Sequence, residues 1–570
     1  MDGRQWIYNR IFQREMKKSI YFLFLIIACQ QQVSAQPSRI LLQDNWKANS
    51  KLTLNLGIRY DVSVPRTERF NRQNWLDLTA PSPLSGVMSL GTLYGAEHFA
   101  SSRERRVVNM DWKDFQPRIG FAFQFAPNTV VRGGYGIYFS QPRSGASGVT
   151  PYTAQGYNVW TNISGTFQDD GATPYARTSN PFPDGLTLPQ GNTLGAWNDI
   201  GFAGVGPTRT MTNTPYEQSW SFGFERQMPW KIIASAEYVG KKGTHLYYAG
   251  ANSVNHLGPQ IENYTPAQIE DLLTYVDNPF AGYITDPNSS LYYDQVQKYQ
   301  LQLPYPQYTG VSTEVPPIGS SIYHGLQLKA EKAYSNGLQF LVTYVWSKSI
   351  DDASANDDNT TWLGSFISIV DPNKLYLERS LSTFDIPHVV QFSYTYDLPV
   401  GRGKAFGGSM RRGWNAVLGG WKTSGIWRIA SGRPLSFGIA DGKALPTYGQ
   451  RPDMAAKPRR NYSKGWNFNY FANPEALQRP ADYTIGTAPR TIGSVRTPRQ
   501  FSSDLALAKD FSLARVREGM RLEFRIEAQN AFNHPVFGDP NTSVDSESFG
   551  QIWYTSIGAR QAQASLKLSF

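Results

Sequence analysis

The chain has 570 residues, of which 55 are basic and 45 acidic, so its formal net charge is +10, and 14% of its residues are aromatic. One cysteine, Cys29, and six histidines exclude a disulfide framework, a cysteine-rich zinc site and an iron–sulfur cluster. The mean hydropathy is below zero, which excludes a helical membrane protein with many spans. It does not exclude a β-barrel, in which only alternate residues face lipid.

The amino-terminal residues 1–38 have the features of a targeting segment. Met16–Lys18 supplies a basic start, Ile20–Ala28 a short apolar run and Val33–Ala35 a small-residue cleavage pattern, as in a secretory signal. Two alternatives stay open. In the first, Ile26–Cys29 is a loose lipoprotein cleavage box with Cys29 as the acylated residue. In the second, the whole segment is an upstream remnant. In each case we expect the folded domain to occupy residues 39–570.

Apolar and polar residues alternate in many downstream segments. In Lys51–Val62 the even positions from Leu52 to Tyr60 are apolar, whereas the odd positions are polar or glycine, and Arg521–Asn530 repeats this pattern. A period of two predicts strands with one apolar and one polar face. We expect thirteen strands of about ten residues each, the length that a tilted strand needs to cross a bilayer. Their expected starts lie near Arg39, Lys51, Phe115, Val130, Glu217, Lys231, Ile322, Gly337, Ile386, Asn415, Ser502, Met520 and Arg560.

The links between these strands are alternately short and long. The short ones are tight turns or slightly longer links: Ala48–Ser50, Ala126–Thr129, Gln227–Trp230, Tyr334–Asn336, Leu398–Arg412 and Ser512–Gly519. The long ones are irregular: Ser63–Asp114, Gln141–Tyr216, Lys241–Ser321, Lys348–Asp385, Ala430–Phe501 and Ala531–Ala559. Short periplasmic turns and long extracellular loops are typical of transmembrane barrels.

The predicted fold is therefore all-β, an antiparallel transmembrane barrel of the outer membrane with about 13–14 strands and long extracellular loops. The strands of a soluble β-sandwich or propeller also alternate apolar and polar residues and are joined by frequent turns. A propeller would show a repeat of fixed period, which the sequence lacks, and a sandwich would not produce the regular order of short and long links. Aromatic residues such as Tyr60, Trp220 and Trp346 also gather at strand ends, as in the aromatic girdles of barrels.

The last strand ends the chain on an aromatic residue. Leu566, Leu568 and Phe570 alternate with polar residues, and this pattern is similar to the assembly signal that the outer-membrane insertion machinery recognises. Phe570 would also serve as an anchor at the periplasmic interface. Lipid and the barrel assembly machinery are therefore expected partners.

Few residues suggest chemistry beyond this. The charges Arg521, Glu523, Arg525 and Glu527 share one face of a strand and are expected to line a wet lumen. No catalytic, cofactor or metal site is predicted, and we expect neither enzymatic activity nor nucleic-acid binding. The four residues Asp351, Asp352, Asp357 and Asp358 lack the spacing of a calcium loop and are expected in a solvated loop. Basic Gly401–Lys404 is expected to be a periplasmic turn.

Four segments together resemble the barrel of TonB-dependent receptors of the Oar-like group. They are Gln43–Asp61, Phe115–Phe121, Tyr323–Gln327 and Arg525–Pro535. The resemblance implies an outer-membrane barrel which, in complete members, has an amino-terminal extension, a plug in the lumen and a TonB box. Such receptors are expected to have 22 strands. This chain shows thirteen and has no room for a plug or TonB box before Arg39, so we expect a carboxyl-terminal portion of a longer receptor.

The resemblance implies uptake of a solute through the outer membrane, with TonB as a partner only if a plug is present. The alternative is a structural or adhesive surface barrel without transport activity, whose long loops bind a partner. The solute cannot be inferred from the sequence, because loops and plug determine the choice of substrate.

Overall fold

The computed structural model describes residues 38–570, except 63, 66, 87–89, 141–155, 158, 160, 162–170, 207–208, 210–212, 249–252, 313–315, 353, 355–368 and 463–468. Residues Pro37–Phe570 form one compact unit. The predicted signal features between Met16 and Ala35, including Cys29, lie outside the described residues.

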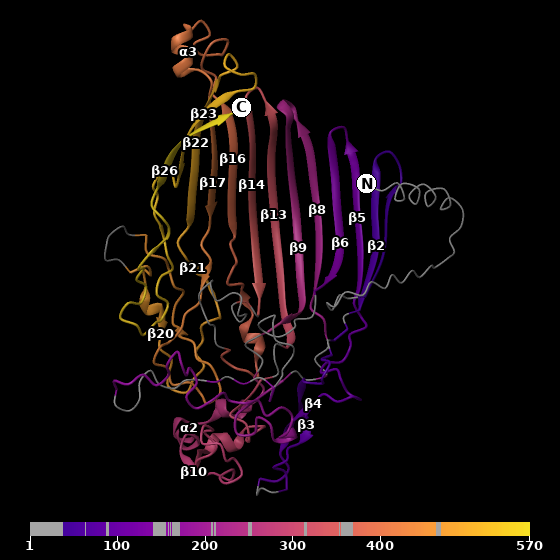
Figure 1. The fold of residues 1–570 in the computed structure, drawn as a ribbon, viewed down its shortest axis with the longest axis vertical. Coiled ribbons are helices and arrows are strands. Elements are labelled where there is room, and N and C mark those ends of the chain that lie inside the picture. The colour runs from indigo at the N-terminus through magenta and orange to yellow at the C-terminus, as the bar shows by residue number, and fades with distance from the viewer. Residues whose placement is uncertain are drawn as a thin grey trace, which may run out of the picture. The chain divides into compact units, whose positions relative to one another are not determined.

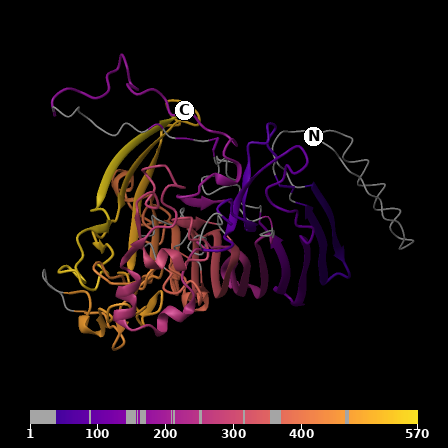
Figure 2. The ribbon, with the colours of Figure 1, turned by 90° about the horizontal axis from the view of Figure 1, so that it is seen from below.

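One large antiparallel sheet of fourteen strands dominates this unit (Figure 1). Thirteen long strands follow chain order in it: β1 Ser38–Lys47, β2 Leu52–Val62, β5 Phe115–Ala126, β6 Thr129–Phe139, β8 Tyr216–Met228, β9 Ile232–Tyr247, β13 Pro317–Ser335, β14 Leu338–Asp351, β16 His388–Asp397, β17 Trp421–Ala430, β22 Gln500–Ser512, β23 Arg521–Gln529 and β26 Gln561–Ser569. The fourteenth, β15 Ser380–Leu381, pairs only with β14. Each predicted strand corresponds to one of the thirteen, and Figure 2 shows that the sheet is bent rather than flat.

Two of the predicted strand starts are wrong by several residues. The strand expected from Asn415 begins at Trp421, because Arg412–Leu418 forms the helix α3. Apolar residues three and four positions apart fit a helix better than a strand here, and Gly419 and Gly420 separate α3 from β17. β13 begins at Pro317 rather than Ile322. Its pairing with β9 continues toward the amino end, past a register shift at Gly319, as far as Pro317.

The short links are tight, as predicted. Between β13 and β14, Ser335 pairs with Leu338, so the loop is the two residues Asn336 and Gly337. Both have positive φ, 53° and 77°. This is the backbone of a type I′ turn, in which asparagine followed by glycine is the favoured pair because both tolerate the left-handed region.

The long links contain short elements and are more ordered than expected. Small two-stranded sheets form from β3 Asn74–Pro81 with β4 Tyr94–Phe99, β7 Ala203–Val205 with β12 Gly310–Ser312, β10 Tyr275–Asp277 with β11 Gln295–Gln297, β18 Pro434–Leu435 with β21 Ile492–Arg496, β19 Asp453–Met454 with β20 Leu477–Gln478, and β24 Val536–Phe537 with β25 Thr555–Ile557. Helical turns in the long links are α2 Pro266–Leu272 and the 3₁₀ helices Gly195–Trp197, Pro259–Asn263, Lys298–Gln302, Leu375–Glu378 and Pro474–Ala476. The 3₁₀ helix Pro229–Lys231 lies instead in the short link between β8 and β9. In the part of the chain that the structure describes, no helix combines the length and apolar character of a membrane span.

Buried apolar clusters lie in these long links and not in the large sheet. The largest is built on Leu76, Phe280 and Tyr308, and another on Phe437 and Phe471. Within the described ranges, none of the four clusters includes a buried residue of the thirteen long strands. The long loops therefore fold around cores of their own, which explains why they need not be structureless despite their length.

The large sheet has one apolar and one polar face. Residues directly opposite each other in the register share a face, and the row through Leu54 continues through Phe121, Gly133, Phe222, Tyr238, Leu326 and Trp346. Large side chains on this face stay exposed, among them Phe222 at 46% and Leu566 at 68%. A soluble sandwich would cover such a face with a second sheet. Here the face is left for lipid.

Candidate lumenal site

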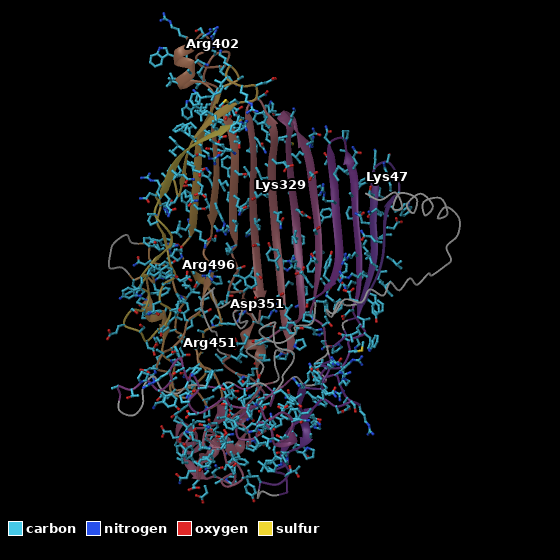
Figure 3. All side chains as sticks on the ribbon, viewed as in Figure 1. Lys47, Lys329, Asp351, Arg402, Arg451 and Arg496 are labelled. Carbon is cyan, nitrogen blue, oxygen red and sulfur yellow. The ribbon has the colours of Figure 1, made fainter. Side chains whose placement is uncertain are left out.

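The opposite face of the sheet is mainly polar, although apolar residues such as Leu341 and Ile426 also lie on it. Charged side chains on it form ion pairs within and between strands: Arg132 Nη2 to Glu225 Oε1 at 3.0 Å, Lys241 Nζ to Glu217 Oε1 at 2.9 Å and Lys329 Nζ to Glu331 Oε2 at 2.6 Å. Figure 3 labels Lys329 midway along β13. Barrels place such alternating polar residues on the lumen side.

A hollow of about 370 Å³ lies on the polar face over the amino-terminal strands. Small residues on neighbouring strands, Gly57, Gly120, Gly134 and Ser221, leave this space free. At its edge the Arg118 guanidinium lies 4.9 Å from the centre of the Tyr138 ring. An aromatic ring and a cation beside an open, polar wall are suitable for holding a polar solute.

A second hollow of about 510 Å³ lies over β14 to β23. Its lining residues include Ser393, Thr395, Ser424, Asp504 and Arg525. These side chains offer hydroxyl, carboxylate and guanidinium groups, so the hollow can donate and accept hydrogen bonds along its length.

The structure places the four predicted lumenal charges on the polar face of β23. Arg525 Nε donates to Glu527 Oε2 at 2.6 Å, Gln563 also donates to Glu527, and both charged residues line the second hollow. Glu523 lies directly opposite Lys567, and Arg521 lies opposite Ser569, closer to the short-turn end. The strand thus brings Arg525 and Glu527 into the hollow and leaves Arg521 and Glu523 outside it.

The carboxyl-terminal residues lie on the apolar face of the last strand. Leu566 and Leu568 are exposed and stand opposite Phe524 and Leu522. Phe570 is 78% exposed, and the guanidinium of Arg517 lies 5.7 Å from the centre of its ring. The assembly role of these three residues stays a prediction.

We expect Phe570→Ser to lower the amount of assembled protein several-fold in the outer-membrane fraction, because it removes the terminal aromatic ring of the predicted assembly signal. The ring is 78% exposed, so its loss should cost the folded state little. Heat-modifiable migration on gels would measure the folded fraction. Ser569→Ala, a neighbouring change on the polar face, is the control. Equal amounts of folded protein in both variants would contradict the assembly role.

Histidines and aromatic residues form a band on the apolar face toward the long loops. The Tyr238 hydroxyl lies 2.7 Å from His324 Nδ1, and the Tyr344 hydroxyl lies 2.9 Å from His388 Nδ1. Trp220 contacts the same His324 ring edge-on. Amphipathic rings at this position fit the boundary between hydrocarbon and headgroups.

A network of buried charges between a long loop and the end of β14 was not predicted from the sequence. The Arg490 and Asp351 side chains are 0% and 4% exposed and form an ion pair, with Arg490 Nη2 at 2.5 Å from Asp351 Oδ1. Arg490 Nε also donates to the Glu378 carbonyl at 2.7 Å, and Glu378 in turn pairs with Arg451. Figure 3 labels Asp351, Arg451 and Arg496 near the ends of the strands that lead into the long loops. This network joins the 430–500 loop to the end of β14.

The expectation that the aspartates near residue 351 lie in a solvated loop is wrong for Asp351, which is buried because Arg490 compensates its charge. Asp352 accepts a hydrogen bond from the Ser320 amide at 2.7 Å, and burial raises its pKa above the ordinary value. Asp357 and Asp358 lie outside the described residues. No group of three or more potential metal ligands occurs in the parts of the chain that are described.

Three carboxylates, those of Asp61, Asp111 and Asp114, lie near one another where β2 and β5 meet the long loops, but they do not form a group that could hold a metal ion. Asp61 binds Arg59 Nε at 2.8 Å and Gln116 Nε2 at 2.8 Å, and Asp111 accepts from the Thr214 amide at 3.1 Å. Asp114 is buried beside them. Burial, and then the negative charges of Asp111 and Asp61, raise the pKa of Asp114 to about 6.

We therefore expect Asp114 to make stability depend on pH. Because its folded-state pKa is raised from 3.8 to about 6, its contribution is fully present below pH 3.8 and is lost as the pH rises through 6. Asp114→Asn should flatten this dependence and stabilise the protein above pH 6 by about 1–2 kcal/mol. Thermal unfolding between pH 4 and 8 would measure it. An unchanged pH profile in the variant would contradict the assignment.

A family model agrees with this architecture. A family model described as an outer membrane beta barrel domain matches residues 31–563. No curated protein matches the chain. Similar solved structures include the siderophore receptor PirA from Acinetobacter baumannii, with 11% identity, a TM-score of 0.40, and coverage of 94% of this chain and 46% of that chain. The outer membrane transporter YddB from Escherichia coli has 9% identity, a TM-score of 0.38, and coverage of 93% and 44%.

This chain spans less than half the length of either of these two solved proteins. The family match, by contrast, covers nearly the whole chain and agrees with the large antiparallel sheet, its exposed apolar face and its polar opposite face. The chain belongs to the outer membrane β-barrel domain family and is a protein of the outer membrane.

Proposed function

We propose that this chain is the barrel part of a solute-uptake receptor of the TonB-dependent type. The observation that carries the proposal is the mainly polar face of the sheet, with paired charges and two hollows of about 370 and 510 Å³. A barrel that served only as an anchor would need no open space on this face. The hollows are large enough for a small polar solute in contact with several strands.

The folded loops support a selective entrance. Their apolar clusters give them fixed shapes, and the buried pair Arg490 and Asp351 fastens one loop to the end of a strand. Binding sites commonly lie on loops that a rigid scaffold positions. We infer that the loops select the solute and that the polar face passes it on.

The TonB dependence rests on the sequence resemblance, which the order and spacing of four segments carry jointly: Gln43–Asp61, Phe115–Phe121, Tyr323–Gln327 and Arg525–Pro535. A plug domain and a TonB box are then required, and TonB is a partner of whichever polypeptide carries them. Membrane lipid and the barrel assembly machinery are the other partners that we propose.

Solute profiling in the native host would test the proposal. A deletion strain and the complemented strain are grown in defined mixtures of solutes, with and without a protonophore, and depletion of each solute from the medium is measured. We expect the complemented strain to deplete at least one solute that the deletion strain leaves, and the protonophore to abolish the difference. Identical depletion in both strains would overturn the transport proposal.

A variant that narrows the second hollow makes the test specific to the lumen. Ser393→Trp places a large ring in the hollow and should slow uptake several-fold at equal protein abundance. Phe392→Trp, the adjacent change on the apolar face, is the matched control and should leave uptake unchanged. Equal uptake by both variants would show that the solute does not pass through this hollow.

A surface adhesion protein is the second candidate. Several loop tyrosines are largely exposed, including Tyr376 at 72% and Tyr462 at 77%. Exposed aromatic residues are common in binding surfaces. Loss of surface attachment by the deletion strain, with solute depletion unchanged, would favour this function over transport.

A further inference from the structure

The link between β16 and β17, residues 398–420, differs from the other short links because it contains an α-helix. It includes α3, and Figure 1 shows α3 beyond the strand ends, at the end of the sheet opposite to β3, β4 and β10. Figure 3 labels Arg402 at the same place. We call residues 398–420 the turn-end segment.

The turn-end segment is strongly basic. It contains Arg402, Lys404, Arg411 and Arg412, and it has no aspartate or glutamate. All four cationic side chains are exposed. Four like charges in about twenty residues favour an anionic partner over solvent, because each charge raises the local potential for the others.

The same segment exposes large apolar side chains. Trp414 is 63% exposed, Val417 60% and Leu418 47%, and their spacing of three and four residues places them on one face of α3. Asn415 points elsewhere, since its Oδ1 accepts a hydrogen bond from the Arg402 amide at 2.7 Å. The helix is thus fastened to the basic turn through Asn415, and its apolar face stays uncovered.

Contacts with the large sheet connect the segment to the lipid-facing surface. Lys509 of β22 lies on the apolar face, directly opposite Trp421 of β17. Lys509 Nζ donates to the carbonyl of Ala416 at 2.5 Å and to that of Val417 at 3.2 Å, and Trp421 Nε1 donates to the Val417 carbonyl at 2.8 Å. The carboxyl end of α3 therefore lies at the rim of the apolar face.

We propose that the turn-end segment is an interfacial anchor that binds anionic phospholipid in the leaflet at the short-turn end. Trp414, Val417 and Leu418 enter the boundary between headgroups and acyl chains, and the four cations bind lipid phosphates. Apolar burial combined with attraction to anionic headgroups is the usual basis of interfacial binding. A protein partner is less favoured, because Lys509 and Trp421 make the segment continuous with a surface that already contacts lipid.

Fluorescence quenching would test the proposal on the full chain in bilayers. An environment-sensitive fluorophore is attached to Val417→Cys in a Cys29→Ser background, and quenching by brominated acyl chains is compared with quenching by aqueous iodide. The bilayers are phosphatidylethanolamine with either phosphatidylglycerol or phosphatidylcholine. We expect brominated lipid to quench strongly in the anionic bilayers and several-fold less in the zwitterionic ones.

Charge variants separate lipid recognition from simple apolar contact. Arg411→Gln with Arg412→Gln should reduce the brominated-lipid quenching in anionic bilayers several-fold. The matched control is Lys457→Gln with Arg459→Gln, two exposed cations in a long loop, which should change nothing. Quenching of the label by iodide but not by brominated lipid would overturn the proposal, as would equal quenching in both bilayers or in both charge variants.

Discussion

Replacing Arg490 by methionine should reduce the local stability of the loop end by about 3–5 kcal/mol. The reason is that Asp351, 3% exposed, would keep a buried charge without its partner, and the donations to the carbonyls of Ser354 and Glu378 would also be lost. Hydrogen exchange of the amides around residues 349–351 and 378–381, with the protein in lipid, would measure the local free energy of opening.

The control for this prediction is Arg479→Met in the same loop. Arg479 is exposed, and its Nη2 lies 3.5 Å from Asp482 Oδ1, so its loss should cost only about 0–1 kcal/mol. Adding Asp351→Asn to Arg490→Met should recover part of the stability, since the uncompensated charge is then removed. Equal, small effects of both arginine variants would show that the buried pair does not hold the loops.

The second large effect is expected on the apolar face. Phe222→Arg places a charge near the middle of β8 on the proposed lipid side, and it should destabilise the protein by about 2–4 kcal/mol. Phe222 is already exposed in the chain by itself, so the same change in a soluble protein would cost almost nothing. Urea titration of the protein in lipid vesicles would measure the difference.

Ser221→Arg is the matched variant one residue away, on the polar face beside the first hollow. It should change stability little, because the arginine would stay in water. If both variants have the same cost, the two faces of β8 do not meet different environments, and the barrel interpretation fails at this strand.

The long strands could be predicted because the bilayer imposes a period of two over about ten residues. In Lys51–Val62 each position has the polarity that its face requires, and β2 covers almost the same residues. The start of β17 could not be placed in the same way. Before Trp421, apolar residues occur at helical spacing, and they form α3. The hydrogen bond from Lys509 to the Ala416 carbonyl holds this helix, and it comes from a residue far along the chain that a local pattern does not include.

The candidate site was predictable only in part. Alternation on one strand is enough to assign Arg525 and Glu527 to the polar face. The first hollow is formed by small residues from different strands, such as Gly57, Gly120 and Gly134. Which of these residues become neighbours depends on the pairing register, which alternation along a single strand does not give. Arg490 lies in an irregular segment, 139 positions from Asp351 at the end of β14, and no periodic pattern links the two residues.

Spin-label accessibility along β8 would test the central claim most directly. Nitroxides are attached one at a time to cysteines that replace each residue from Ser219 to Glu225, in the Cys29→Ser background, with the protein in a bilayer. We predict that labels at 220, 222 and 224 collide with oxygen dissolved in the acyl chains, whereas labels at 219, 221, 223 and 225 collide with a water-soluble nickel chelate. An apolar row that the chelate reaches as readily as the polar row would show that those side chains do not face lipid.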